Sequence, residues 1–380
     1  MKKKKSILKI VTILFLAILF TYFGFWLNSY IVGEPYSYSL FVTIKTLFLI
    51  IAILAFLISS YLIHKSAKSK ALTNSIFFFF TTFSLFIVIE IAFSFIVFST
   101  NVFTDMQNNI WIKRYFKPIN SLGYRDTEPK TETGKKNILV IGDSFVAGHG
   151  IKHEEMFTFL MSEQLKKDYS VFNLGVCGSH TDREFDSLIN YPVKPDIIIL
   201  AYYHNDIESA MIKLNKTPKI ENPKDKLNGL SRLFVNNSLF ANFLFSNYAK
   251  KQISSQFMES PNNDILAYLD DSLWGYQVTA LDKFNNYCLK NRIPLLIINF
   301  PTLNEGITIV NRIAGNKIED YCLQNQIEFI NIYDYVIDMP MSKRIANPMD
   351  NHPSAEVNKI VSNLLIEKIR EIDILPTLYN

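Results

Sequence analysis

Five short apolar runs, each followed by a helical pattern, recur along the chain from residue 137 to 371, and this alternation constrains the fold more than any other feature. The runs are 137–142, 171–174, 196–203, 293–300 and 328–332. Continuously apolar runs of this length are typical of strands buried on both faces of a parallel sheet. The helical patterns lie at about 153–167, 181–191, 264–290, 305–325 and 354–371. The order predicts an α/β fold of three layers, with helices on both faces of an open parallel sheet and right-handed connections.

The first hundred residues differ in composition from the rest and are dominated by Phe, Ile, Leu and Val. Three apolar stretches, at about 7–31, 39–63 and 74–99, each exceed the roughly 20 residues that cross a bilayer as a helix. The first follows Lys2–Lys5 as in a signal peptide, but it is too long and no small-x-small cleavage site follows it. We therefore predict a membrane domain of three transmembrane helices over 1–100.

The distribution of lysine predicts the orientation of these helices. Lys2–Lys5 precede the first stretch, and three more lysines lie in the second linker, 64–70, whereas the first linker, 32–38, has only Glu34 as a charge. Because lysine marks cytoplasmic loops, the chain after residue 100 is expected on the extracytoplasmic side of the cell membrane. The protein would then be a multi-pass membrane protein in which 101–134 forms a juxtamembrane linker.

Other features narrow the classes of ligand and partner. The net charge is +4 with no basic patch interleaved with aromatics, so nucleic acid is not an expected partner. The three cysteines, Cys177, Cys288 and Cys322, lack the spacing of a metal site or a disulfide framework. Glu90, within the third apolar stretch, is a functional candidate by default, or it pairs with Lys45 or faces the helix bundle.

Polar groups that carry chemistry follow the strand-like runs. The first run ends in Gly142-Asp143-Ser144, and a serine there lies at the sheet edge where open α/β folds hold ligands. Ser144 is therefore a candidate nucleophile; the alternative is that Asp143 and Ser144 only cap a helix or shape the turn. Gly178 and Asn205 follow the second and third runs, and His352 precedes the last helix, so all these groups can meet in one crevice.

In this order the motifs resemble the four blocks of the SGNH/GDSL hydrolase family, over roughly residues 135–372. The blocks are Gly142–Phe145, Asn173–Gly178, Asn205–Asp206 and Asp350–Pro353. The resemblance implies a flavodoxin-like hydrolase domain at 135–375 that uses no cofactor and no metal. It also implies a catalytic triad of Ser144, His352 and Asp350, with an oxyanion hole formed by the N–H groups of Ser144 and Gly178 and by the Asn205 amide.

The chemistry explains these residue types, but one member of the triad stays open. A serine hydroxyl needs a base to accept its proton, and histidine has a suitable intrinsic pKa, while a carboxylate holds the imidazole tautomer. The acid of the family often lies three residues before the histidine, where this chain has Met349, so Asp338 or Asp334 are alternatives to Asp350. His204 stands where glycine often precedes the asparagine, and it is either a substrate contact or a structural histidine.

A metal site is the weaker interpretation of the polar residues. His149, His180, His204, Asp143 and Asp206 show no recognisable ligand spacing. The chain also lacks a Gly-x-Ser-x-Gly elbow, which argues against an ordinary α/β-hydrolase. Residues 211–262 interrupt the alternation and form an inserted cap with one or two helices, expected to be an acyl-binding lid, a contact to the outer leaflet, or an extra helix on the core.

Three functions follow from these expectations. The first is a membrane-anchored serine esterase that removes acyl groups from envelope glycans or lipids through an acyl-enzyme. The second is an O-acyltransferase on cell-surface polysaccharide, which implies a membrane acyltransferase partner that supplies the acyl group. The third is a non-catalytic module that binds glycan in the crevice.

Overall fold

The computed structural model describes residues 100–103, 105–260, 264–304 and 308–378, with isolated residues between 74 and 93. The expected membrane segments 7–31 and 39–63 lie outside the described residues, as do most of 74–99, Lys45 and Glu90. Within the described part of the chain, no helix combines the length and apolar character that crossing a membrane requires.

The chain divides into two compact units. One comprises 99–227 and 246–380, and the other comprises 1–98 together with 228–245. The two helices within the expected cap are α8 (Gly229–Asn237) and α9 (Leu239–Glu259). In the smaller unit the Phe93 ring lies 5.2 Å from that of Phe240 and 5.1 Å from that of Phe243. The apolar side chains of the insert therefore contact a residue of the third apolar stretch.

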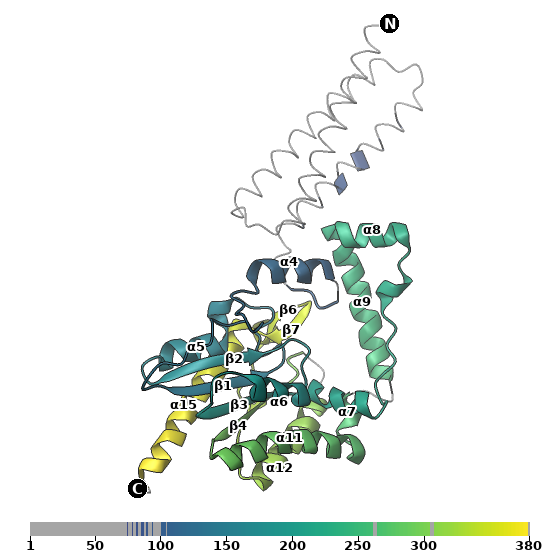
Figure 1. Cartoon of the computed structure of the whole chain (residues 1–380). Helices are drawn as coiled ribbons and strands as arrows, with labels where there is room; N and C mark the ends of the chain where they lie inside the picture. The colour runs from purple at the N-terminus through teal and green to yellow at the C-terminus, as the bar shows by residue number, and fades with distance from the viewer. Residues whose placement is uncertain are drawn as a thin grey trace, which may run out of the picture. The chain divides into compact units, whose positions relative to one another are not determined.

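A five-stranded parallel sheet organises the larger unit (Figure 1). Its strands are β1 (Lys136–Gly142), β2 (Tyr169–Gly175), β3 (Ile197–Tyr203), β4 (Leu295–Phe300) and β5 (Glu328–Asn331). Their spatial order is β2-β1-β3-β4-β5, and every neighbouring pair is parallel. The predicted parallel α/β sheet is confirmed. In this order the winding reverses between β1 and β3, and ligands of such folds bind beyond the carboxyl ends of the strands at that point.

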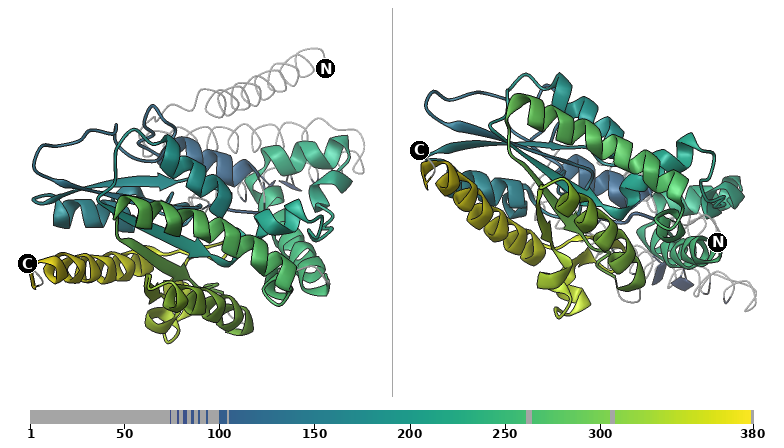
Figure 2. Two further views of the ribbon diagram at one scale, coloured as in Figure 1. Left: turned by 60° about the horizontal axis from the view of Figure 1, so that its bottom comes forward. Right: turned by 90° about the horizontal axis from the view of Figure 1, so that it is seen from below.

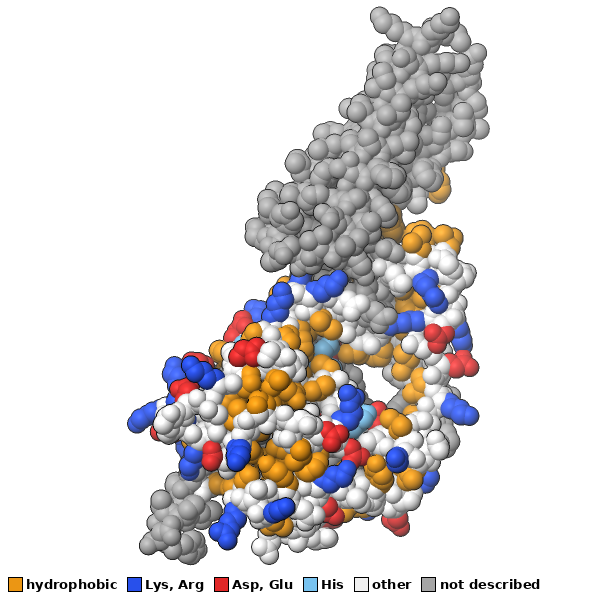
Figure 3. Space-filling view, viewed as in Figure 1, with side chains coloured by type: hydrophobic (Ala, Val, Ile, Leu, Met, Phe, Trp, Pro, Cys, Tyr) orange, Lys and Arg blue, Asp and Glu red, His pale blue; other side chains and the backbone are white. Residues whose placement is uncertain are grey.

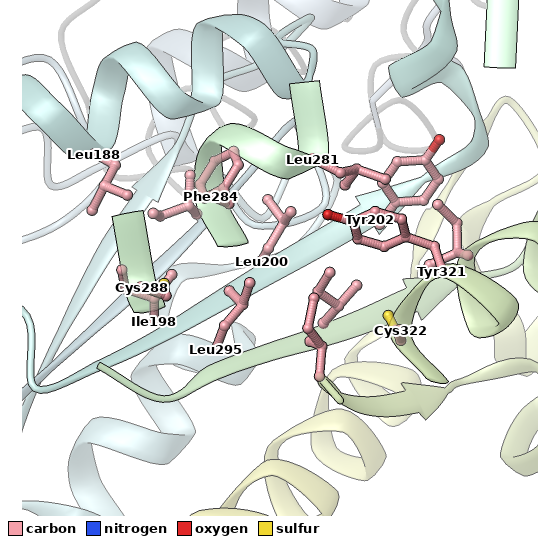
Figure 4. Packing of buried hydrophobic residues seen from close by; sticks show 14 of the residues in the cluster. Leu188, Ile198, Leu200, Tyr202, Leu281, Phe284, Cys288, Leu295, Tyr321 and Cys322 are labelled. Atoms are coloured by element: carbon pink, nitrogen blue, oxygen red, sulfur yellow. The ribbon is translucent and has the colours of Figure 1, made fainter. Parts of the chain in front are cut away.

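Helices cover both faces of the sheet (Figure 2). One face packs against α5 (Phe157–Leu165) and α15 (Ala355–Leu378), and the other against α6 (Thr181–Asn190), α11 (Asp271–Asn291) and α12 (Thr308–Gln324). Successive residues of β1 alternate between them: Ile138 and Val140 join the first core, Leu139 and Ile141 the second. Both faces of the strand are buried, which explains why its sequence is continuously apolar. Figure 4 shows the second core, where Phe284 packs near Leu200.

Shorter elements complete the larger unit. They are α4 (Asp105–Tyr115), η1 (His153–Glu155), η2 (His204–Ile207), α7 (Glu208–Lys213), η3 (Pro223–Lys226), α10 (Asp264–Ala267), α13 (Tyr333–Val336), α14 (Met341–Arg344), β6 (Ile345–Asn347) and β7 (Asp350–Pro353). The last two strands pair as an antiparallel hairpin separate from the main sheet.

The segment 101–134, expected as a linker, packs into the larger unit. Arg125 is buried there, and its guanidinium donates to the backbone carbonyls of Tyr115, Ala147, Gly148 and Ile151. The same guanidinium lies over the Trp111 and Phe116 rings. A buried cation with this many acceptors is costly to expose or to leave unpaired, so the segment is fixed against the loop that follows Ser144.

Candidate active site

The turn after β1 aims Ser144 at the carboxyl edge of the sheet. Gly142 is required at the end of the strand, because a Cβ there would lie 2.6 Å from Val146 Cγ2 and 2.9 Å from Ala201 O. Asp143 Oδ1 then accepts from the N–H of Phe145 at 2.8 Å, which closes the turn. Asp143 thus shapes the turn, as one interpretation of the sequence held, and the turn in addition presents the Ser144 hydroxyl.

His352 reaches Ser144 from the β6–β7 hairpin. Its Nε2 lies 2.7 Å from Ser144 Oγ, and its Nδ1 is hydrogen-bonded to Asp350 Oδ1. The backbone N–H of His352 donates to the same carboxylate oxygen at 3.1 Å. A carboxylate only accepts, so Nδ1 carries the proton and the Nε2 lone pair faces the serine hydroxyl. The structure therefore brings Ser144, His352 and Asp350 together in the arrangement of a nucleophile, a base and an orienting acid.

Of the three candidate acids, Asp350 alone contacts His352. Its side chain has no solvent exposure, whereas Asp334 and Asp338 are exposed near α13. Burial by itself would raise the pKa of Asp350, but the charge of His352 and the hydrogen bonds from His149 and His352 outweigh it and hold that pKa well below its usual range. Asp350 is therefore ionised at any pH at which the site would work.

The charge of Asp350 sets an expected pH dependence. Burial favours the neutral His352 ring, but the charge and hydrogen bond of Asp350, with the charge of Asp143, outweigh it and raise the pKa of His352. Only the neutral ring accepts the serine proton, so kcat/KM is expected to fall as pH drops through a midpoint above about 6.5. Measuring kcat/KM against pH with an ester substrate tests this, and an acid limb with its midpoint below the ordinary histidine value would contradict it.

Asn205 lies beside Ser144 at the start of η2. Its Nδ2 donates to Asp143 Oδ2 at 3.4 Å, and the same oxygen is 3.5 Å from Ser144 Oγ. Gly178 is exposed and lies three residues beyond the end of β2, the strand next to β1, and a Cβ added there would have no atom within 4 Å. The Asn205 amide and the Ser144 hydroxyl thus share a partner in the Asp143 carboxylate, and Gly178 lies on the adjoining loop.

Loss of the Asn205 amide is expected to slow the chemical step. If that amide stabilises the oxyanion, Asn205→Ala lowers kcat by about 10²- to 10³-fold, with a smaller effect on KM, because the charge develops only in the transition state. Steady-state kinetics on an activated ester measure this. Asn190→Ala is the matched control, since Asn190 is exposed on α6 and bonds only to the carbonyl of Asp186 one turn earlier. A loss confined to KM would exclude the oxyanion role.

An aromatic row lies next to the triad and includes His204. The Phe145 ring stacks on Tyr203 at 4.2 Å, and the Tyr203 ring lies 4.1 Å from that of His204. Phe145 also lies 5.3 Å from the His352 ring. This packing favours the structural interpretation of His204. Asp206, the next acid along, is buried and accepts from the Tyr203 N–H at 3.0 Å, which holds the turn that presents Asn205.

Among the described residues, one group has the proximity that a metal needs: the ligand atoms of His149, Asp350 and His352 lie within 4.8 Å of one another. These atoms are already engaged with each other, because both histidines bond to the Asp350 carboxylate. A cation there would have to break the contact that orients His352, so the group fits an orienting acid better than a metal site. His180, His204, Asp143 and Asp206 are not part of it.

Two contacts of Asp350 were not predicted from the sequence. Its second oxygen, Oδ2, accepts from the Thr100 hydroxyl and lies 3.1 Å from His149 Nδ1. Thr100 is 250 positions away along the chain, and nothing in its surroundings in the sequence signals the contact. The position of His149 in the loop that carries Ser144 is a signal in the sequence that it lies near the site.

No family model matches the chain, and no curated protein matches it. Among solved structures it is similar to a carbohydrate acetylesterase family member from Sinorhizobium meliloti, at 13% identity over 62% of this chain and 98% of that one, with a TM-score of 0.36. It is also similar to AlinE4, an SGNH-hydrolase family esterase (14%, 64% and 98%, TM-score 0.34). A third similar structure is a lipase/acylhydrolase from Enterococcus faecalis (12%, 62% and 96%, TM-score 0.37).

One of these structures, AlinE4, belongs to the SGNH-hydrolase family, which is the family that the four motifs of this chain resemble. The activity of this chain is inferred from the geometry around Ser144.

Proposed function

We propose that the protein is a membrane-anchored serine esterase that works through an acyl-enzyme. The observation that carries this proposal is the 2.7 Å separation between Ser144 Oγ and His352 Nε2, with His352 Nδ1 bonded to a buried carboxylate. A serine in this setting is activated, whereas a serine that only shapes a turn needs neither partner.

The geometry supports a reaction in two stages, acylation of Ser144 and hydrolysis of the acyl-enzyme. His352 Nε2 takes the Ser144 proton while Oγ bonds to the ester carbonyl carbon, and the carbonyl oxygen becomes an oxyanion near the Asn205 amide. The oxyanion collapses, the bond to the alcohol breaks, and the imidazolium gives its proton to the leaving alkoxide. Water then attacks the acyl-enzyme with His352 again as base, which releases the carboxylic acid and restores the serine.

The substrates and the location follow from the sequence. We propose that three helices within residues 1–100 anchor the chain and that the catalytic unit lies outside the cytoplasm, where acyl groups on envelope glycans or lipids would be its substrates. Basic and acidic side chains are interspersed on the face of the larger unit in Figure 3, an arrangement that does not favour nucleic acid as a partner. A reporter fused after residue 100 tests the location; activity of a cytoplasm-specific reporter would contradict it.

The activity is tested on the full chain in detergent with a fluorophosphonate probe and with acetyl and longer acyl esters. Wild-type labelling and hydrolysis, both absent in Ser144→Ala and His352→Ala, support the esterase. Labelling with acyl transfer only after a glycan acceptor is added supports an O-acyltransferase instead. If wild-type protein binds glycan but is neither labelled nor active, the result supports a non-catalytic glycan-binding module.

A further inference from the structure

The carboxylate of Asp350 has two sides with separate partners. Oδ1 faces His352, and Oδ2 faces a cluster made of Thr100, His149 and Gly150. The enclosure is tight: a Cβ added to Gly150, which has a φ of +89°, would lie 2.9 Å from Asp350 Oδ2 and 3.3 Å from Thr100 Oγ1. The direction in which Oδ1 points is therefore fixed by what holds Oδ2.

Thr100 is held in place by the hairpin that carries the acid. Asn347 Nδ2 donates to the backbone oxygen of Thr100 at 3.1 Å and lies 3.2 Å from its hydroxyl. The N–H of Val102 donates to Met349 O at 3.3 Å. These contacts tie residues 100–102 to both sides of the turn between β6 and β7, next to α4 in Figure 1.

His149 is held by α4. Its Nε2 lies 2.8 Å from Asn108 Oδ1, and its ring lies 5.2 Å from that of Trp111. Only 7% of its side chain is exposed. The ring also lies 4.6 Å from the ring of His352 on the other side of the carboxylate. Because a carboxylate only accepts, Nδ1 of His149 donates to Asp350 Oδ2.

We propose that Thr100 and His149 are positioning residues that hold Asp350 in the orientation His352 needs, and that Asn108 and Trp111, which contact His149, consequently support the active site. This inference rests on the proposed function. It assigns a role to the segment that directly follows the apolar part of the chain, which sequence alone presented as a linker. The segment does not touch the reacting atoms; it acts through the acid.

Removing a donor from Oδ2 is expected to change the base as well as its orientation. The titratable groups that face Asp350 and His352 are Asp143, His149 and Cys177. With one donor fewer on Oδ2, more of the carboxylate charge acts on His352 and stabilises the imidazolium. The acid limb of kcat/KM should then move to higher pH by about half to one unit, the size of one hydrogen bond.

The test uses His149→Phe, which keeps an aromatic ring against Trp111 but cannot donate. We expect kcat to fall about tenfold to hundredfold, as with other changes to residues that orient a catalytic group, with KM little changed and the acid limb raised. His149→Asn places an amide N–H near the position of Nδ1. It should restore most of kcat and return the midpoint of the acid limb of kcat/KM to its wild-type pH. Thr100→Val deletes one hydroxyl. It should lower kcat and raise the midpoint of the acid limb of kcat/KM, both by less than His149→Phe does.

Controls separate failure of this inference from failure of the proposed function. His153→Phe is the matched control, because His153 lies four residues further along the chain, in η1, and packs on Phe159 without contacting Asp350. If wild type hydrolyses esters and His149→Phe and Thr100→Val keep its kcat and pH profile, the positioning role is excluded and the esterase stands. If wild type is neither labelled by fluorophosphonate nor active, both fail. If His149→Phe has no cooperative thermal transition, that variant is misfolded, and the kcat and pH profile of Thr100→Val then test the positioning role.

Discussion

Replacing Ser144 with alanine is expected to lower kcat for ester hydrolysis by about 10⁶-fold and to abolish labelling by a fluorophosphonate. The hydroxyl is the atom that bonds to the substrate, and without it His352 has no proton to accept at 2.7 Å. What remains is the catalysis that the oxyanion donors and substrate binding supply, about 10³- to 10⁴-fold over water. Hydrolysis of an activated ester, followed with and without the probe, measures both effects.

A second serine provides the control for Ser144→Ala. Ser187 is half-buried on α6, where its hydroxyl donates to the Arg183 carbonyl one turn earlier. Ser187→Ala should therefore keep wild-type kcat and labelling. Thermal unfolding of both variants should match that of wild type, since neither hydroxyl fills a gap in the apolar core. Turnover that persists in Ser144→Ala would mean that another residue is the nucleophile.

The sheet was predictable because its signal is local. Each strand is buried on both faces, so its apolar run is continuous and is bounded by polar turn residues, and the predicted run 137–142 corresponds to β1 at Lys136–Gly142. The chemical groups that follow the strands were predictable for the same reason. In a parallel sheet all carboxyl ends lie at one edge, so Ser144 and Asn205 had to be neighbours once their strands were adjacent.

Helix boundaries depended on capping contacts that apolar periodicity does not report. The pattern at 264–290 predicted one helix, but the structure has α10 and then α11 starting at Asp271. Asp270 accepts from the N–H groups of Ser272 and Leu273, and a side chain used in this way starts a new helix. The helix expected at 153–167 likewise begins as a short 3₁₀ turn, with α5 starting only at Phe157.

The surroundings of the acid were beyond prediction because they come from distant segments. Asp350 lies on a two-stranded hairpin whose strands have three and four residues, too short to give a periodic signal. Its partners Thr100 and His149 come from before β1 and after it, and a contact across 250 positions appears only when the chain has folded. Spacing along the sequence could therefore suggest Asp350 as the acid but could not exclude Asp334 or Asp338.

The Asp350→Asn variant decides among these acids, and it is expected to lower kcat by about 10⁴-fold. Thr100 and His149 both present donors to the position of Oδ2, so the amide oxygen of an asparagine would turn towards them. Its NH₂ group would then face His352 Nδ1 and donate to it. That reverses the tautomer: the proton moves to Nε2, which faces Ser144 Oγ and can no longer accept from it.

The matched variants are Asp334→Asn and Asp338→Asn, which lie exposed near α13 and should keep wild-type kcat. The fluorophosphonate reaction offers a second readout, because it also requires an activated serine. Labelling of Asp350→Asn should be slowed in proportion to kcat, while the two control variants are labelled at the wild-type rate. A large loss in Asp334→Asn or Asp338→Asn, with Asp350→Asn active, would mean that the hairpin adopts another arrangement during turnover and that the buried carboxylate is not the orienting acid.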